Sequence, residues 1–133
     1  MNHSRPQKKG FSLVEVLAAV AILGIMAFLA IPNIVQMKSD SETNLSIARA
    51  EAMNMGIASF VQANGRDAAG TAWSVASAEQ RYNLVSPYLA FAPSSFNSYM
   101  PTNYSLALPT GVTTLTKCGL AKVEGGSTIP IPY

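Results

Sequence analysis

The sequence predicts an α+β protein in which one long N-terminal helix packs against a small domain with a short helix and a small antiparallel sheet. Three observations lead to this fold class. An uninterrupted apolar run is followed directly by apolar residues at helical spacing. A helix-capping pattern begins at Ser77. Beyond residue 100, short segments of alternating apolar residues lie between residues typical of turns.

The apolar run covers residues 11–31 and contains one charged side chain, Glu15. At about 1.5 Å of rise per residue it forms roughly 30 Å of helix, which matches the hydrocarbon thickness of a bilayer. Three Lys or Arg residues precede the run, and the next basic residue is Lys38. The positive-inside rule therefore predicts a single-pass protein with a cytoplasmic N-terminus and its C-terminal domain across the membrane.

The residues at the start of this run carry a more specific signal. The segment KKGFSLVEVL, which begins at Lys8, closely resembles the leader junction of type IV pilins and type II secretion pseudopilins. In that family a prepilin peptidase cuts after the glycine and methylates the new N-terminal residue. The resemblance implies cleavage between Gly10 and Phe11, N-methylation of Phe11 and a role in assembly for Glu15.

The resemblance covers residues 8 to about 33. Gly24 and Pro32 fall where family members commonly have a glycine and a helix-loosening proline, so both are expected to kink the helix. The chain accordingly divides into four parts: a leader peptide (1–10), a transmembrane and filament-core half-helix (11–33), an amphipathic continuation (34–63) and a small globular domain (64–133).

The cost of burying Glu15 gives a physical reason for assembly. A carboxylate inside a membrane span costs roughly 2.5 to 3.5 kcal/mol on insertion scales, so it is expected to find a partner or to be neutralised. The sequence predicts no partner for it within its own helix. Cleavage creates an ammonium group on Phe11, which a neighbouring subunit, staggered along the helix axis, presents to Glu15. The alternative is that Glu15 lies near the interface and reaches the headgroups.

Charge and composition argue against other function classes. The net charge of +2 is carried by the leader, since removing its three Lys and Arg residues leaves six basic against seven acidic side chains. No basic face remains for nucleic acid. The only histidine is His3 and the only cysteine is Cys118, so the processed chain has neither a Cys–His pair nor a His-containing triad. We expect no enzyme, no cofactor and no metal site.

Cys118 is expected to be a small buried apolar group, with an intermolecular disulfide or a lipid attachment as the alternatives. One cysteine cannot form an intramolecular disulfide. The resemblance would allow a C-terminal loop closed by a disulfide or a calcium site, and this chain has neither device. That departure and the small outer domain slightly favour a type II secretion pseudopilus over a surface pilus.

The helical pattern continues past the membrane segment to about residue 63, which predicts one helix of roughly 80 Å. One apolar row repeats at three- and four-residue spacing: Ile47, Ala50, Met53, Ile57 and Val61. A second row adjoins it: Leu45, Ala48, Ala52 and Met55. The combined face is expected to seat the soluble domain, and helix contact in an assembly is its second use.

The remaining elements follow from caps and turns. Gly65 is expected to cap the long helix, with residues 68–71 as a loop. Ser77 and Gln80 form a capping-box pattern for a second helix, and Pro87 ends it. Its apolar face carries Tyr82, Val85 and Leu89.

Strands are predicted at residues 104–108, at 112–117 across a turn at 109–111, and around 120–124. The tail 125–133 is expected to be an extended edge or a loose end because it contains two prolines. Most of the aromatic residues in this region are expected to form the core: Trp73, Tyr82, Tyr88, Phe91, Phe96, Tyr99, Tyr104 and Tyr133.

The resemblance implies a structural subunit whose partners are a prepilin peptidase, other pilin or pseudopilin subunits, an assembly platform protein and an ATPase. It places the precursor in the bacterial inner membrane, with the C-terminal domain in the periplasm and a pseudopilus or surface pilus as the product. Two rival functions remain open: a non-polymerising single-pass protein that binds a partner or ligand, and a membrane-tethered enzyme. A pure anchor should tolerate Glu15→Leu or Glu15→Val, whereas a filament subunit should insert but assemble poorly.

Overall fold

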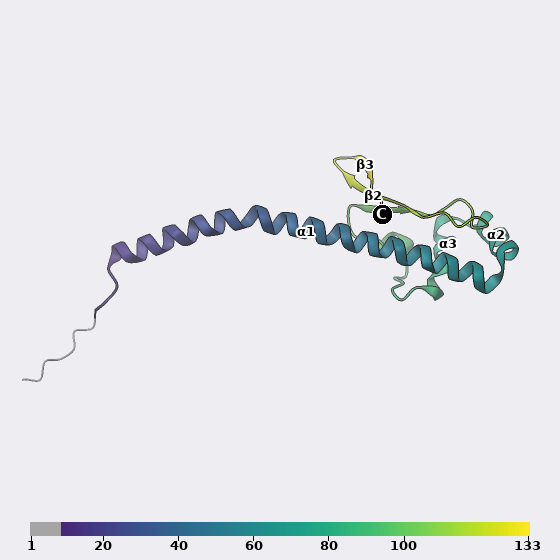
Figure 1. Ribbon diagram of the computed structural model, residues 1–133, viewed down its shortest axis with the longest axis horizontal. Helices are drawn as coiled ribbons and strands as arrows, with labels where there is room; N and C mark the ends of the chain where they lie inside the picture. Colours follow the sequence, from purple (N-terminus) through teal and green to yellow (C-terminus); the bar gives the residue numbers. More distant parts are fainter. Residues whose placement is uncertain (1–8) are drawn as a thin grey trace, which may run out of the picture. The chain divides into compact units, whose positions relative to one another are not determined.

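The computed structural model describes residues 9–133, so the predictions that concern residues 1–8 lie outside the described residues. A long helix α1 (Leu13–Asn64) is followed by the short helices α2 (Arg66–Ser74) and α3 (Ala78–Val85) and by three strands (Figure 1). This arrangement confirms the predicted α+β class. The chain divides into two compact units, the first ending at Ser39 and the second beginning at Asp40.

In the first unit, α1 is a bare helix. Every described residue before Ser39 is exposed, and α1 continues through Gly24 and Pro32 without a break. Within the described residues, α1 is the one helix that is long and apolar enough to cross a membrane, by length and composition. It begins at Leu13, two residues later than predicted. A loosening role for Gly24 and Pro32 stays a prediction.

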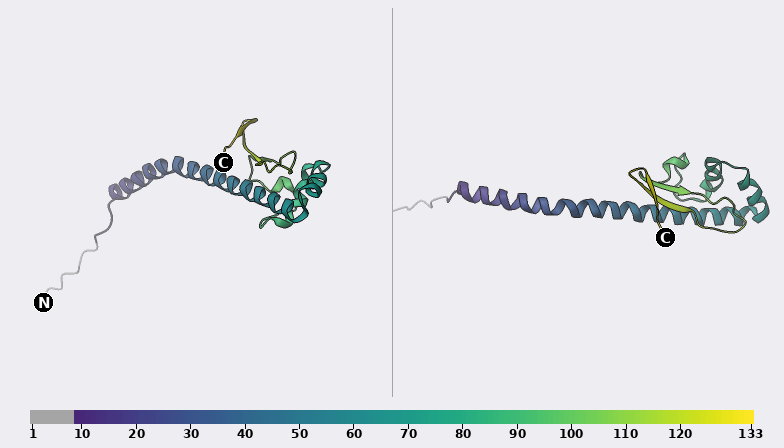
Figure 2. Two further views of the ribbon diagram at one scale, coloured as in Figure 1. Left: turned by 45° about the vertical axis from the view of Figure 1, so that its right-hand side comes forward. Right: turned by 90° about the horizontal axis from the view of Figure 1, so that it is seen from above.

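In the second unit, α1 supports the rest of the domain along one side (Figure 2). Of the first predicted apolar row, Ala50, Met53 and Ile57 are buried, while its two outer members are partly buried against the core. The second row is exposed, with Met55 exposing 72% of its surface. The prediction that this row also seats the domain is therefore wrong, because the small domain covers only one side of the helix.

The segment after α1 is helical, and the predicted loop at residues 68–71 is wrong. Gly65 separates the two helices with a φ of 81° and a ψ of 150°, which is not the left-handed helical cap but is a positive-φ conformation that glycine adopts without strain. Ala69 and Trp73 are spaced four residues apart on α2, and both are fully buried. Burial of this face stabilises a helix too short to form alone. The Trp73 indole N–H also donates to the Pro109 carbonyl at 2.8 Å.

The predicted capping box of α3 is confirmed. The Ser77 hydroxyl accepts from the Gln80 N–H at 3.3 Å, and the Ser77 N–H donates to Gln80 Oε1 at 2.9 Å. The helix ends at Val85, where the 3₁₀ turn η1 (Ser86–Tyr88) carries Pro87. A second 3₁₀ turn, η2 (Phe96–Ser98), follows in the connection to the sheet.

The sheet has the order β1 (Tyr104–Ala107), β2 (Gly119–Glu124), β3 (Ser127–Pro130), and both pairs are antiparallel. The predicted strand at residues 112–117 is wrong. Val112 is buried in that segment, but residues 113–117 are all exposed and lack the alternation that a half-buried strand requires. Leu120 is buried instead and pairs with Leu106, so β2 takes the place beside β1.

The tail forms an edge strand, in line with the prediction of an extended edge. Gly125 and Gly126 both have positive φ and turn the chain tightly from β2 into β3. All four residues of β3 are exposed, and Pro130 is its last residue, where a missing backbone donor is tolerated.

The core lies between α1, the two short helices and the sheet. The prediction that aromatic residues fill it is confirmed for Trp73, Tyr82, Tyr99 and Tyr104, which are buried. Phe91 is an exception, since it exposes 52% of its surface. Two further aromatic residues of the predicted core, Phe96 and Tyr133, are partly buried. Tyr88 is exposed, like Phe91. Cys118 is a free thiol and is buried, as predicted.

Candidate functional site

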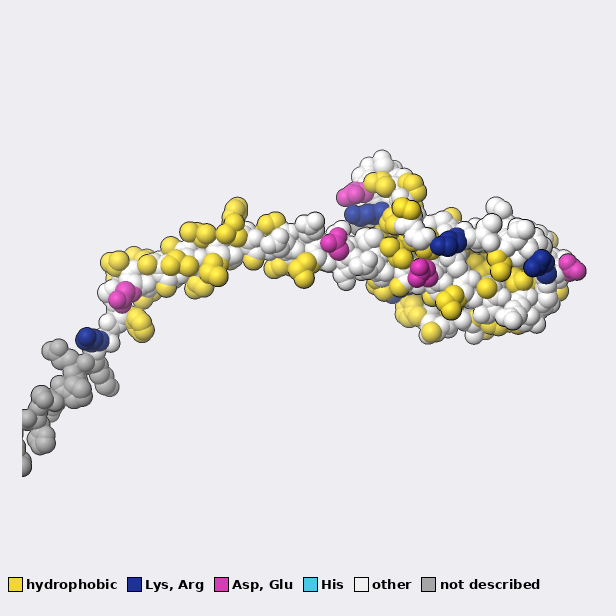
Figure 3. All heavy atoms as spheres, in the orientation of Figure 1, with side chains coloured by type: hydrophobic (Ala, Val, Ile, Leu, Met, Phe, Trp, Pro, Cys, Tyr) yellow, Lys and Arg dark blue, Asp and Glu magenta, His cyan; other side chains and the backbone are white. Residues whose placement is uncertain are grey.

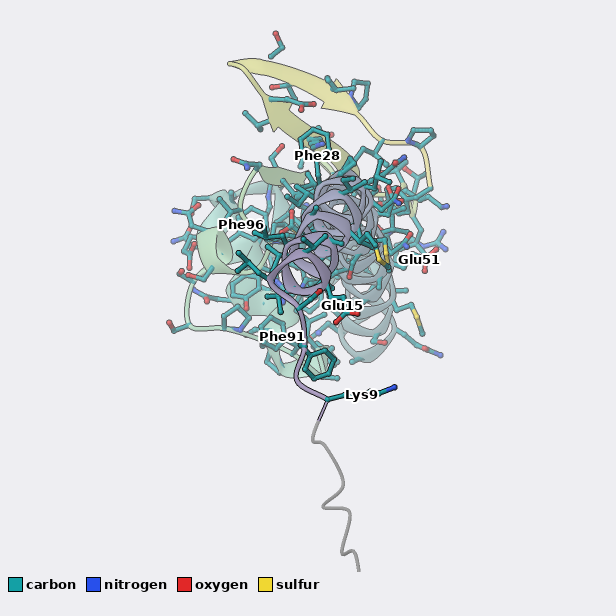
Figure 4. The ribbon with its side chains drawn as sticks, turned by 90° about the vertical axis from the view of Figure 1, so that its left-hand side faces the viewer. Lys9, Glu15, Phe28, Glu51, Phe91 and Phe96 are labelled. Carbon is teal, nitrogen blue, oxygen red and sulfur yellow. The ribbon has the colours of Figure 1, made fainter. Side chains whose placement is uncertain are left out.

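The junction predicted to be cut lies in open, non-helical backbone. Gly10 has no neighbouring atom within 4 Å of where a Cβ would lie, and Phe11 exposes 89% of its surface. Neither residue belongs to α1. Figure 4 shows Glu15 on the first turn of the helix and Lys9 in the extended segment before it. The bond between Gly10 and Phe11 is therefore accessible from solvent.

Ser12 and Glu15 form a capping box at the start of α1. The Ser12 N–H donates to Glu15 Oε2 at 3.0 Å, and the Glu15 N–H donates to the Ser12 hydroxyl at 3.2 Å. The prediction that Glu15 has no partner within its own helix is therefore wrong, because Ser12 at the start of that helix supplies one. Sequence reasoning missed this pair, although serine followed three residues later by glutamate is a known signal for a helix start.

Glu15 also lines an apolar groove of about 500 Å³ together with Phe11, Val16 and Ala19. These residues come from the first two turns of α1 and the residue at the predicted cut. No Lys or Arg lies between Lys9 and Lys38 in the sequence. The groove thus presents one carboxylate on an otherwise apolar surface, which suits a cation carried on an apolar helix.

The surface beside this groove is largely apolar along residues 11–37. Figure 3 shows hydrophobic side chains covering this part of α1. The exposed fraction is 60% at Leu17, 76% at Phe28 and 71% at Met37. An exposed apolar surface of this extent is typical of contact with lipid or with other apolar helices.

A polar cluster joins the second half of α1 to the end of the chain. The Asn54 side chain accepts from the Cys118 N–H at 2.8 Å and donates to the Tyr133 hydroxyl at 3.1 Å. The Tyr133 hydroxyl in turn donates to the Cys118 carbonyl at 2.6 Å. These three residues hold the segment before β2 and the C-terminal segment against α1. The sequence offered no signal for the cluster, because its members lie far apart in the chain.

Arg49 occupies the opposite flank of α1. Its guanidinium lies 4.5 Å from the centre of the Phe91 ring and donates to the Tyr99 carbonyl, while the Tyr99 hydroxyl donates back to the Arg49 carbonyl at 2.8 Å. Burial raises the pKa of Tyr99 to about 12. The contacts of Arg49 with Phe91 and Tyr99 hold the connection between α3 and the sheet against the long helix.

Among residues 9–133, no group of three His, Cys, Asp or Glu side chains is placed to hold a metal ion. Burial raises the pKa of the Cys118 thiol to about 12, so it is not a thiolate near neutral pH. The notable functional features of the described chain are thus the open junction, the capped carboxylate and the bare apolar helix.

Comparison with known proteins agrees with this picture. A family model described as a prokaryotic N-terminal methylation motif matches residues 5–31. The chain is similar to the type IV major pilin protein PilA of Myxococcus xanthus (strain DK1622), with 25% identity over 127 residues. The alignment covers 96% of this chain and 46% of the relative, so the chain spans about half the length of the curated relative that it matches. No solved structure matches the chain.

Proposed function

We propose that this chain, which carries the N-terminal methylation motif and is similar to a type IV major pilin, is a structural subunit of a helical filament built from packed N-terminal helices, as in the type IV pilin and pseudopilin family. One observation carries the proposal. The open Gly10–Phe11 bond stands directly before an unburied apolar helix whose single carboxylate, Glu15, lines an apolar groove. A helix with this surface needs lipid before assembly and other helices after it.

Processing is the first step of the proposed function. A prepilin peptidase hydrolyses the Gly10–Phe11 amide, which leaves a carboxylate on Gly10 and an ammonium group on Phe11, and the same enzyme then methylates that nitrogen. The precursor sits in the bacterial inner membrane with residues 1–10 in the cytoplasm, as the basic leader favours. The second unit then lies in the periplasm.

Assembly follows from the charge of Glu15. An ionised carboxylate in hydrocarbon is costly, whereas a cation at hydrogen-bonding distance offsets much of that cost. The ammonium group on Phe11 of a staggered neighbour supplies such a cation within the apolar groove. The exposed row on the second half of α1, which includes Met55, provides further surface for subunit contact. An assembly platform protein and an ATPase complete the machine.

The filament is a type IV pilus or a type II secretion pseudopilus. The similar protein from Myxococcus xanthus is named a type IV major pilin, and this favours the pilus. The single cysteine, which cannot close a loop by a disulfide, and the small domain slightly favour the pseudopilus. Immunogold labelling of intact cells decides between them, because a pilus subunit is found on long surface filaments and a pseudopilus subunit is retained in the envelope.

Two measurements test the proposal. Intact-mass analysis of the membrane form should show loss of residues 1–10 and gain of one methyl group. A Glu15→Gln variant removes the charge at nearly constant shape, and it should insert and be processed yet form few filaments in a sedimentation assay. Glu15→Asp, which keeps a carboxylate, serves as the charge-matched control and should retain more assembly.

The rival function as a non-polymerising anchor has a distinct outcome in the same assays. An anchor protein keeps its full mass in cells that contain active prepilin peptidase, and its behaviour is unchanged by Glu15→Leu. Unprocessed wild-type protein would overturn the filament proposal. Turnover of a substrate by the processed protein would instead support the membrane-tethered enzyme.

A further inference from the structure

The Ser12–Glu15 capping box has a consequence for processing. We propose that Ser12 is a positioning residue for leader removal, because its cap ends α1 short of the Gly10–Phe11 bond and keeps that bond in non-helical backbone. The inference rests on the proposed function, since it concerns the bond that the prepilin peptidase cuts. It assigns a role before cleavage to two residues whose side chains otherwise lie on an exposed helix end.

Hydrogen bonding at the start of α1 shows how the cap limits the helix. The first helical bond runs from the Val16 N–H to the Ser12 carbonyl at 3.2 Å. Extending the helix by one residue requires the Glu15 N–H to bond the Phe11 carbonyl, but that N–H is directed to the Ser12 hydroxyl. The cap and an extended helix therefore compete for the same donor.

The reciprocal bond adds to this effect. The Ser12 N–H, which an N-terminally extended helix would direct to a carbonyl of the leader, donates instead to Glu15 Oε2. Gly10 adds a residue of low helix propensity on the leader side. Hydrolysis requires access to the carbonyl carbon of Gly10, and an α-helix would hold this carbonyl in a bond to the Val14 N–H. The capped start leaves the carbonyl of Gly10 outside the helical ladder.

The same cap gives Glu15 two partners in succession. In the precursor, its carboxylate accepts from Ser12 within one chain. After hydrolysis, the ammonium group on Phe11 of a neighbour offers a charged partner, and charge-assisted bonds are stronger than neutral ones. The cap thus satisfies the carboxylate partly while the precursor waits in the membrane, without removing its need for a cation.

The test measures the rate of leader removal from the full-length precursor in membranes that contain prepilin peptidase. Ser12→Ala removes the cap and inserts a strong helix former, so the initial rate should fall roughly 2- to 30-fold, the range expected for loss of an N-cap. Ser12→Asn restores a capping side chain without a charge and should cleave at near the wild-type rate. Ser59→Ala removes an exposed hydroxyl near the C-terminal end of α1, far along the chain from the junction; it is the matched control and should change nothing.

A structural measurement separates capping from direct contact with the peptidase. In NMR spectra of the full-length precursor in micelles, the Cα shifts of Gly10 and Phe11 should be non-helical in the wild type and move towards helical values in Ser12→Ala. Equal cleavage rates for Ser12→Ala and wild type would overturn the inference. Equal slowing of Ser12→Ala and Ser12→Asn would also overturn it, because a capping role predicts rescue by Asn.

Glu15→Gln separates this inference from the proposed function. Glutamine keeps an acceptor for the Ser12 N–H, so the capping box survives and cleavage should proceed at the wild-type rate, while assembly fails for lack of charge. If the wild type is cut and Ser12→Ala is cut equally fast, the capping role fails and the filament function stands. If the wild type is never cut, the filament function itself fails.

Discussion

The replacement Asn54→Ala tests the polar cluster that joins the segment before β2 and the C-terminal segment to the long helix. Asn54 lies on α1 and bonds both the Cys118 N–H and the Tyr133 hydroxyl. Alanine removes both bonds and leaves a buried backbone donor at Cys118 without its acceptor. Tyr133 keeps its bond to the Cys118 carbonyl, so the C-terminal segment loses only part of its attachment.

The size of the effect follows from these contacts. A buried N–H left without an acceptor costs about 1 to 3 kcal/mol, and the lost bond to the Tyr133 hydroxyl about 0.5 to 1.5 kcal/mol. The two terms share one network and do not simply add. Alanine gains a few tenths of a kcal/mol in helix propensity. We therefore expect a net loss of roughly 2 kcal/mol, which for a unit of this size lowers Tm by about 8 to 16 °C.

The assay is denaturation of the processed chain in detergent micelles. Trp73 is the only tryptophan in the sequence, and it is fully buried 6.2 Å from the Phe60 ring, so its fluorescence reports unfolding of the second unit. Asn44→Ala is the matched control, an exposed asparagine on the same helix, and should stay within about 0.5 kcal/mol of wild type. A change in Asn54→Ala no larger than in this control would refute the reasoning.

Two further predictions concern packing and pH. In Gly56→Ala the new Cβ would lie 2.7 Å from Leu89 Cδ2 and 2.8 Å from Val85 Cγ1. The cost of overpacking, about 1 to 3 kcal/mol, should outweigh the gain in helix propensity of about 1 kcal/mol, so the variant should be less stable in the same denaturation assay. A variant more stable than wild type would contradict the close contact. Burial raises the pKa of Cys118 from 9.0 to about 12, and that of Tyr99 from 10.0 to about 12. The folded chain therefore binds these protons more tightly than the unfolded chain, so the free energy of unfolding should be at its full value below about pH 9 and decline as the pH rises towards 12. In Cys118→Ala the decline should begin about one pH unit higher, near the ordinary pKa of tyrosine. The same pH dependence in Cys118→Ala and wild type would exclude the thiol as the source of the decline.

Sequence reasoning succeeded where the signal is local. The apolar run, the capping box at Ser77 and the glycine stop at Gly65 each depend on local sequence. The helices they predict are present, with α1 ending at Asn64 and α3 beginning at Ala78, although α1 begins two residues later than predicted. The same kind of local signal is present at Ser12, which is followed three residues later by Glu15, and it gives the capping box that begins α1.

Local sequence signals do not show which distant segments pack or pair with one another. Residues 112–117 resemble a strand in composition, but β1 pairs with β2, whose buried Leu120 faces the core. Residues 68–71 resemble a loop, yet burial of Ala69 and Trp73 makes them helical. In each case the free energy of burial depends on which distant surface is available, and a single sequence does not contain that information.

By itself, the sequence determined that the chain has one long apolar helix preceded by a short basic segment, because the hydrophobicity, length and charge of a segment are properties of the segment alone. Only the tertiary structure decided which side of α1 the domain covers, which row of that helix stays exposed, and that Asn54 ties the C-terminal segment in place. Those features depend on contacts between residues far apart in the chain, whose free energies arise only when the chain brings them together.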